Sequence, residues 1–210
     1  MRKALILTLV LLVIPFSFLV LKKYQEGKPA PPDSVALEFP LKNGKFFVTI
    51  SGKFMGRHSL PIEKYALDII KYPTLSSLVK FRQTSLDADP TYGTSIYSPC
   101  IGKVKSVRDG VADQPIGIKN TKVPAGNMVI VACDGFNVMM AHFKTNSIKV
   151  RLGDRVEAGE ELGQLGNSGN TDGPHLHFMA YLSNDQTGEV TPLPMSFGDR
   201  YLHTWDSLAN

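Results

Sequence analysis

Beyond residue 34, hydrophobic positions occur in short runs that are rich in β-branched and aromatic side chains. Gly, Pro, Asn and Asp, which favour turns, separate these runs. Short strands without long helices predict a mainly β domain, built as an antiparallel sandwich or a partly open barrel. The predicted strands are Val35–Phe39, Lys45–Ser51, Ala66–Ile70, Ile101–Val107, Met128–Ala132, Phe136–Phe143 and Leu176–Leu182.

Two segments depart from this pattern. Pro73–Gln83 has helical periodicity and predicts a short helix, with one face formed by Leu75, Leu78, Val79 and Arg82. Asp109–Ala125 contains Gly, Pro and Asn without apolar periodicity, which predicts a long surface loop.

The N-terminus carries an apolar run, Ala4–Leu21, interrupted only by Thr8 and Ser17 and flanked by pairs of basic residues. As a helix it would reach about 27 Å, close to the bilayer core of about 30 Å. Neither a small-x-small cleavage site nor a lipid-attachment cysteine follows it. We therefore predict an uncleaved signal-anchor over residues 1–24, with a cleaved signal peptide and secretion as the alternative. The basic pairs on both sides leave the orientation open.

Residues 25–36 follow as a proline-rich linker, which proline keeps extended and semi-rigid. Residues 37–210 then form the predicted folded domain. The net charge of +4 does not belong to this domain. The first thirty residues hold five basic residues and one acidic residue, which leaves 18 of each in the remainder. A neutral body argues against nucleic-acid binding, which requires a basic face.

The two cysteines, Cys100 and Cys133, lie in or beside strand-like segments. In an exported domain they could form a disulfide, and they could equally be two buried free thiols. Ligation of zinc by cysteine is disfavoured because the chain has no Cys-x-x-Cys spacing.

The segment with the most distinctive chemistry is a small-residue loop from Gly166 that leads into His175-Leu176-His177-Phe178. In a strand, residues i and i+2 point to the same face, so both imidazoles would face one site while Leu176 and Phe178 face the core. Two imidazoles in this arrangement suit a zinc centre in which one binds the metal and the other handles a water proton.

Other residues in strand-like runs extend this pattern. Asp68 lies in an apolar segment, where a carboxylate is costly to bury unless it is paired or binds a metal. His142 lies in a second apolar run, and His58 precedes Asp68 by ten positions. Taken singly, each could be a satisfied or exposed polar residue. Together, one carboxylate and several imidazoles match the open zinc site of a metallohydrolase.

These residues, in this order, resemble the lysostaphin/LytM-type zinc endopeptidases, which cut peptide bonds in bacterial peptidoglycan. The resemblance rests on Tyr65-Ala66-Leu67-Asp68, Met140-Ala141-His142-Phe143 and Gly173-Pro174-His175-Leu176-His177-Phe178. It extends to Val150-x-x-Gly153-Asp154-x-Val156-x-x-Gly159 and Ser98-Pro99-x-x-Gly102-x-Val104, and it spans residues 37–200.

The resemblance implies one zinc per chain, bound by His58, Asp68 and His177, with His142 and His175 as catalytic histidines. His175 would take a proton from water, and His142 would stabilise the oxyanion. The loop 109–125 would wall a substrate groove or be an ordinary insertion. One departure concerns His58, because the commonest family pattern places the first histidine only four positions before the aspartate.

The implied location is extracytoplasmic, with the catalytic domain outside the membrane and a peptidoglycan peptide as substrate. Protein partners and the bond cleaved have no signal in the sequence. Two rivals remain. A non-catalytic cell-wall regulator of the same fold would have lost ligands, whereas this chain retains all five positions. A lipoyl- or biotinyl-type carrier shares the Gly-Asp-x-Val-x-x-Gly pattern but needs a hairpin lysine, and a histidine phosphocarrier would not need Asp68 or His58.

Overall fold

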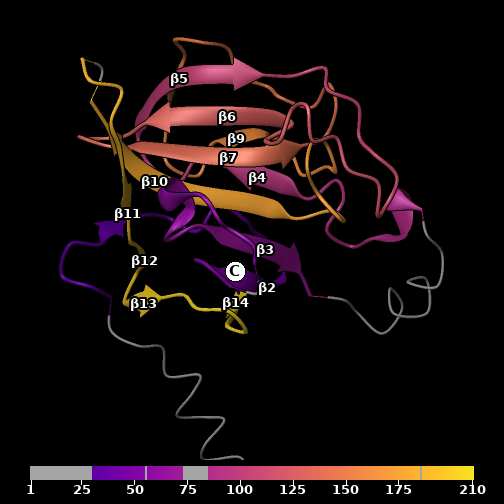
Figure 1. Cartoon of the computed structure of the whole chain (residues 1–210), viewed down its shortest axis with the longest axis horizontal. Coiled ribbons are helices and arrows are strands. Elements are labelled where there is room, and N and C mark those ends of the chain that lie inside the picture. The colour runs from indigo at the N-terminus through magenta and orange to yellow at the C-terminus, as the bar shows by residue number, and fades with distance from the viewer. Residues whose placement is uncertain (1–29, 55, 73–84, 185) are drawn as a thin grey trace, which may run out of the picture.

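The computed structural model of the chain describes residues 30–54, 56–72, 85–184 and 186–210 (Figure 1). The predicted helix over 73–83 and the apolar run 4–21 lie outside these residues. Among the described residues, no helix has the length and apolarity needed to cross a bilayer. Helix is confined there to two short 3₁₀ turns, η1 (Pro61–Glu63) and η2 (Leu86–Ala88). The prediction of a mainly β fold is thus confirmed.

Most strands join one large twisted sheet, in the order β14-β2-β3-β10-β7-β6-β5-β8, and β11 adds to one end of β10. Every pairing in this sheet is antiparallel. Its strands are β2 (Lys45–Ser51), β3 (Leu67–Lys71), β5 (Gly102–Arg108), β6 (Asn127–Ala132), β7 (Asn137–Phe143), β8 (Arg155–Val156), β10 (Leu176–Ser183), β11 (Val190–Leu193) and β14 (Ser207–Ala209).

Two small sheets complete the fold. One pairs β4 (Ser95–Tyr97) with β9 (Glu161–Gln164), and the other joins β1 (Val35–Ala36), β12 (Met195–Phe197) and β13 (Arg200–Tyr201). The strand β1 lies at the end of the predicted linker 25–36 and pairs in parallel with β12. The chain therefore enters the fold at Val35, before the predicted domain start at residue 37.

Alternation along the central strands determines which side chains form the core. In β10, Leu176 and Phe178 are fully buried, as predicted, and pack with Ile69, Met140 and Phe143. The intervening His177 therefore faces the opposite side of the sheet. Cys100 and Cys133 form a disulfide beside this core, which joins the start of β5 to the end of β6.

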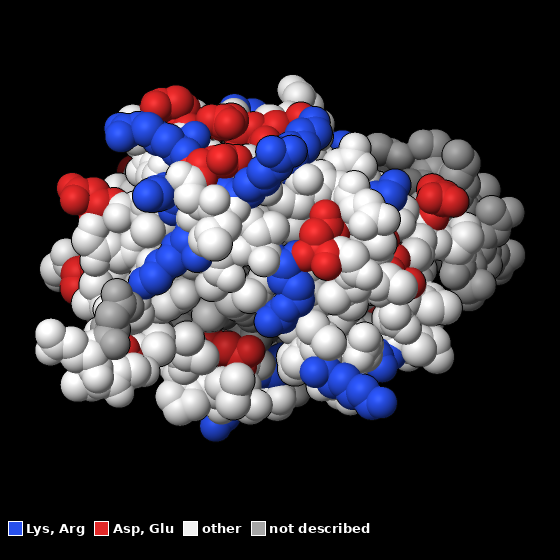
Figure 2. Space-filling model, turned by 90° about the horizontal axis from the view of Figure 1, so that it is seen from above, with Lys and Arg blue, Asp and Glu red and all other residues white. Residues whose placement is uncertain are grey.

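Charged side chains do not segregate on the face seen in Figure 2, where basic and acidic groups are interspersed. This mixture agrees with the balanced count of basic and acidic residues beyond residue 30.

Candidate metal centre and catalytic histidines

Asp68 and His177 are brought together by strand pairing. β3 and β10 are antiparallel neighbours, and the Cα atoms of the two residues are register partners. Their side chains therefore point to the same face, and His177 Nδ1 lies 3.0 Å from Asp68 Oδ1. Both residues are buried. A one-residue slip of either strand would turn its side chain into the core.

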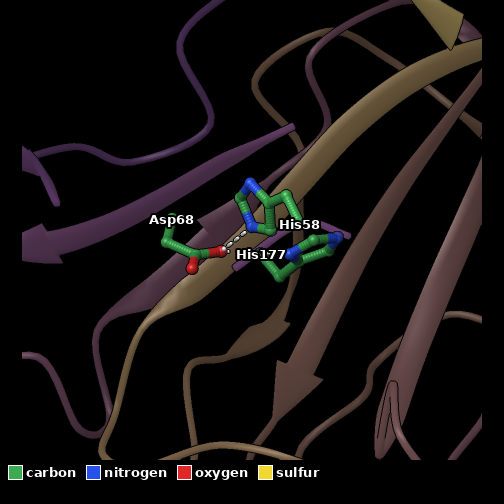
Figure 3. A group of neighbouring side chains, drawn as sticks. All are labelled: His58, Asp68 and His177. Atoms are coloured by element: carbon green, nitrogen blue, oxygen red, sulfur yellow. Dashed lines mark hydrogen bonds and ion pairs between the residues drawn. The ribbon is translucent and has the colours of Figure 1, made fainter. Parts of the chain in front are cut away.

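His58 reaches the same carboxylate from the loop between β2 and β3 (Figure 3). Its Nε2 lies 3.0 Å from Asp68 Oδ1, and its Nδ1 donates to the carbonyl of Gly52 at 3.0 Å. The backbone of His58 has a φ of 51°, in the left-handed region that few residues other than glycine adopt. This turn lets the loop double back, which resolves how a histidine ten positions before Asp68 can meet it.

These three donors fit a divalent zinc ion. His58 Nε2, an oxygen of Asp68 and a nitrogen of His177 all lie within 4.8 Å of one another. Donors around a tetrahedral zinc are about 3.4 Å apart, which lies within this range. Two imidazoles and one carboxylate are also a donor set that catalytic zinc sites use. The carbonyl of Gly52 fixes the tautomer of His58, as second-sphere carbonyls do for metal-binding histidines.

Ionisation of the cluster agrees with this chemistry. Burial alone would raise the pKa of Asp68, but the electrostatic interaction with the nearby His175 ring and hydrogen bonds with His177 and His58 hold that pKa well below its ordinary value. The carboxylate is therefore negatively charged at neutral pH. Burial, the largest single influence, lowers the pKa of His58, but the hydrogen bond to Asp68 and the negative charges of Asp68 and Glu63 together outweigh burial and leave that pKa raised. A buried negative charge among imidazoles is what a cation requires.

His175 lies beside the three donors, directly before β10. Its Nε2 is 3.6 Å from Asp68 Oδ1, and its Nδ1 donates to the carbonyl of Gly173 at 2.8 Å. The hydroxyl oxygen of Thr171 lies 3.1 Å from the same Nδ1. Both contacts are made to Nδ1 on the side of the ring away from Asp68, so Nε2 is the nitrogen that faces the site.

His142 completes the group from the end of β7. Its ring centroid is 4.6 Å from that of His175 and 6.0 Å from that of His177. Its Nδ1 donates to the carbonyl of Ser168 at 2.7 Å, which leaves Nε2 for chemistry. Burial, and then the charges of His175 and His177, lower the pKa of His142 well below its ordinary value. Like His58, it has a left-handed backbone, with a φ of 67°.

Hydrogen bonds join the loop 109–125 to the loop that leads into His175. Backbone hydrogen bonds connect it to the segment 166–173 that precedes His175, and the carbonyl of Ala125 accepts the amide of His142. The bonds to 166–173 are Gln114 N to Asn167 O, Gly117 N to Asp172 O, Asn120 N to Gly169 O and Asn170 N to Pro124 O. The predicted surface loop thus supports His142 and the segment that leads into His175, and nothing in its local sequence signals this role.

A groove with a volume of about 420 Å³ opens beside the cluster. Asp68 and His175 lie at one side, and Ile50 and Ile70 contribute apolar walls. On its rim, Arg57 forms an ion pair with Asp172, which also pairs with Lys119 at 2.9 Å. The site therefore combines a cation-binding cluster, two further histidines and a cleft of a size that admits an extended peptide.

This arrangement defines a metal-dependent hydrolase site on a mainly β fold. The sequence matches peptidase family M23 over residues 82–189, just over half of the chain, and the chain belongs to this family of metallopeptidases. The matched stretch includes His142, His175 and His177, whereas His58 and Asp68 precede it. The predicted family resemblance is thereby confirmed.

Individual relatives share low sequence identity with this chain or match only part of it. An uncharacterized metalloprotease of Buchnera aphidicola is 26% identical over 71% of this chain and 40% of its own length. The peptidoglycan DD-endopeptidase ShyA of Vibrio cholerae is 32% identical over 42% of this chain and 20% of its own. The catalytic domain of lysostaphin from Staphylococcus simulans aligns at 18% identity over 69% of this chain and 84% of that domain, with a TM-score of 0.42. The match thus covers less than half of the length of the Buchnera and Vibrio relatives.

Proposed function

We propose that this chain is a zinc endopeptidase that hydrolyses peptide bonds in peptidoglycan, outside the cytoplasmic membrane. The observation that carries the proposal is the convergence of His58, Asp68 and His177 on one point, with His142 and His175 at its side. Membership of peptidase family M23 supports the peptidase activity. Similarity to a peptidoglycan DD-endopeptidase and to the glycyl-glycine endopeptidase ALE-1 of Staphylococcus capitis supports the substrate class.

In this proposal, His58 Nε2, the Asp68 carboxylate and His177 Nδ1 hold the zinc. When bound, zinc would supply a Lewis acid that polarises a peptide carbonyl and lowers the pKa of water to about 7. Asp68 is ionised, so it supplies a negatively charged donor to the cation. The Gly52 carbonyl and the pairing of β3 with β10 preorganise the three donors.

The two other histidines move the protons. His175 has its Nδ1–H bonded to Gly173, so its neutral ring presents a basic Nε2 that can accept a proton from water. His142 is oriented in the same way by Ser168 and can donate through Nε2 only when protonated. Negative charge that develops on the substrate oxygen favours that protonated form and opposes the effect of burial. His142 then stabilises this charge.

The direct test uses purified full-length protein and intact peptidoglycan sacculi. Zinc-loaded protein should release new amino termini, 1,10-phenanthroline should stop the release, and added zinc should restore it. Sacculi from species with direct cross-links and with glycine bridges would identify the bond class. Release from neither, by zinc-loaded protein that still binds sacculi, would favour the non-catalytic regulator.

The location belongs to the same proposal, with the apolar run Ala4–Leu21 as a membrane anchor and the domain on the outer side. The protein should then stay with membranes during alkaline extraction. Protease added from outside the cytoplasmic membrane should digest the C-terminal domain. A mature N-terminus that maps to residues 25–35 would replace the anchor with a cleaved signal peptide.

A further inference from the structure

Four aromatic side chains gather on one outer edge of the large sheet. Phe47 on β2 lies 5.7 Å from Trp205 and 6.2 Å from Tyr72, measured between ring centroids, and Phe54 lies 6.4 Å from Trp205. We call this group the aromatic platform. Trp205 is 59% exposed and Tyr72 is 46% exposed, so the platform presents aromatic surface to solvent. Exposed groups of this kind mark interaction sites more often than isolated exposed residues do.

Trp205 occupies a costly position for which burial offers little compensation. Its φ of 79° lies in the left-handed region, which is unfavourable for a bulky side chain. The surrounding turn enforces this conformation, since Trp205 N donates to Val48 O at 2.8 Å and His203 N donates to the Asp206 carboxylate at 2.7 Å. A tryptophan held in a strained turn with most of its surface exposed indicates a binding role for the indole ring.

The platform continues the floor of the catalytic groove. Side chains at alternate positions of β3 share a face, so Asp68 and Ile70 lie on the outer side of the sheet. Tyr72 directly follows β3, and its ring contacts Phe47 on the same side. Asp68 and Ile70 line the groove, and Phe47 is the cross-strand partner of Ile70. Figure 1 shows the strands that carry these residues, β2 and β3, side by side, with β10 as the next strand of the sheet after β3.

The spacing suggests what binds there. Asp68 and Tyr72 are four positions apart, which in extended chain is about 13 Å, and an extended ligand of about four residues spans the same distance. In peptidoglycan, peptides of about this length hang from a glycan strand. A stem peptide lying in the groove, with its scissile bond at the metal cluster, would therefore bring its sugar to the platform.

We infer that the aromatic platform is a saccharide-binding site for the glycan strand that carries the substrate peptide. The inference rests on the proposed function for the direction of the peptide, but glycan binding itself needs no metal. A pyranose ring has an apolar face of C–H groups, which packs on an exposed aromatic ring, and a rim of hydroxyls. The indole N–H, the Tyr72 hydroxyl and the ammonium of Lys45, 5.1 Å from the Tyr72 ring, supply polar partners.

Trp205 is the only tryptophan of the chain, so its fluorescence reports on the platform directly. Peptide-free glycan strands, titrated into full-length protein, should shift the emission of Trp205 in a saturable manner. Free stem peptide, which lacks the sugar, should not produce this shift. Tyr72→Ala should weaken glycan binding by about tenfold, the value of one aromatic contact.

Trp205→Gly tests the indole itself by co-sedimentation with insoluble peptide-free glycan. Glycine relieves the left-handed strain, so this variant should fold. It should remain in the supernatant, whereas Leu152→Ala, which alters a residue that is 71% exposed, should sediment like the wild type. His177→Ala should lose hydrolysis and still bind glycan. The effect of this variant on hydrolysis tests the peptidase proposal, whereas its glycan binding tests the platform separately.

Two results would overturn the inference. One is an unchanged Trp205 emission at saturating glycan together with equal sedimentation of wild type and Trp205→Gly. The other is an emission shift that follows protein concentration or anionic lipid vesicles and not glycan, which would assign the platform to a second copy of the chain or to a membrane surface.

Discussion

Asp68 and His177 are 109 residues apart in the chain, yet their Cα atoms are register partners on adjacent strands and their side chains meet at 3.0 Å. The pairing of β3 with β10 therefore builds two of the three candidate metal ligands in one step. The loop that leads into β10 brings His175 to the same carboxylate, with His175 Nε2 at 3.6 Å from Asp68 Oδ1. The candidate ligand His177 therefore lies in the central strand β10, and the candidate catalytic residue His175 lies directly before that strand.

The three proposed ligands should be required for zinc binding. Wild-type protein should contain about one zinc per chain, and Asp68→Ala or His177→Ala should abolish it, because two remaining protein ligands make an inadequate site. Metal analysis after dialysis measures this. His203→Ala, a histidine outside the donor cluster, serves as the control and should retain zinc. Stoichiometric zinc in both ligand variants would contradict the assignment.

His175 and His142 should be needed for hydrolysis and not for metal binding. His175→Ala and His142→Asn should keep zinc while the rate falls about 10²–10⁴-fold, the usual value of a general acid or base. Asparagine is chosen at position 142 because it tolerates the left-handed backbone that His142 adopts. Amino-group release from sacculi and zinc content are measured on the same samples. Loss of zinc in either variant would make that histidine a ligand.

Gly126 should be essential for the contact between the loop 109–125 and the segment 166–173. A Cβ atom there would lie 2.2 Å from the backbone oxygen of Ser168, and φ is +57°. Gly126→Ala should therefore destabilise the protein by about 1–3 kcal/mol more than the same substitution at a glycine with positive φ and open space around it. Gly110→Ala is the matched control, with a φ of +85° and open space around its Cβ. Denaturant unfolding compares the two, and equal losses would show that the loops do not pack closely.

The disulfide should make a large contribution to stability. Cys100 and Cys133 are 33 positions apart, and closing a loop of this length stabilises the fold by about 3–4 kcal/mol in the chain-entropy estimate. Reduction, or replacement of both cysteines by serine, should lower the unfolding free energy by an amount of this order. Thiol titration of the native protein should find no free thiol before reduction and two afterwards. Two reactive thiols in the native protein would disprove the bond.

Alkaline titration should detect the bond between Tyr92 and Asp113. Burial, together with the charge of Asp113 and the hydrogen bond from the Tyr92 hydroxyl at 3.1 Å, raises the pKa of Tyr92 to about 12. A raised folded pKa means that the contribution to stability is complete below the unfolded pKa of about 10 and is lost as pH rises towards 12. The stability difference between wild type and Tyr92→Phe should therefore be constant up to pH 10 and then shrink. A difference independent of pH would refute the shift.

Local patterning predicted much of the large sheet. Six of the seven predicted strands coincide with β2, β3, β5, β6, β7 and β10 to within one residue at each end, because alternation and turn residues are local signals. The seventh, Val35–Phe39, shortens to β1. The short strands β4, β8, β9 and β11–β14 were not predicted. A strand of two to four residues carries too little periodicity, and its pairing depends on partners far away in the chain.

The same division applies to the site. The sequence by itself determined the residue types, the shared face of His175 and His177, and the burial of Leu176 and Phe178, since these follow from the period of a strand. Only the tertiary structure decided that Asp68 faces His177, that Nε2 of His58 and Nδ1 of His177 meet it, and that Cys100 pairs with Cys133. It also decided that the loop 109–125 supports His142 and the segment that leads into His175. Register, tautomer and loop docking depend on hydrogen bonds between distant residues, and no local pattern encodes such bonds.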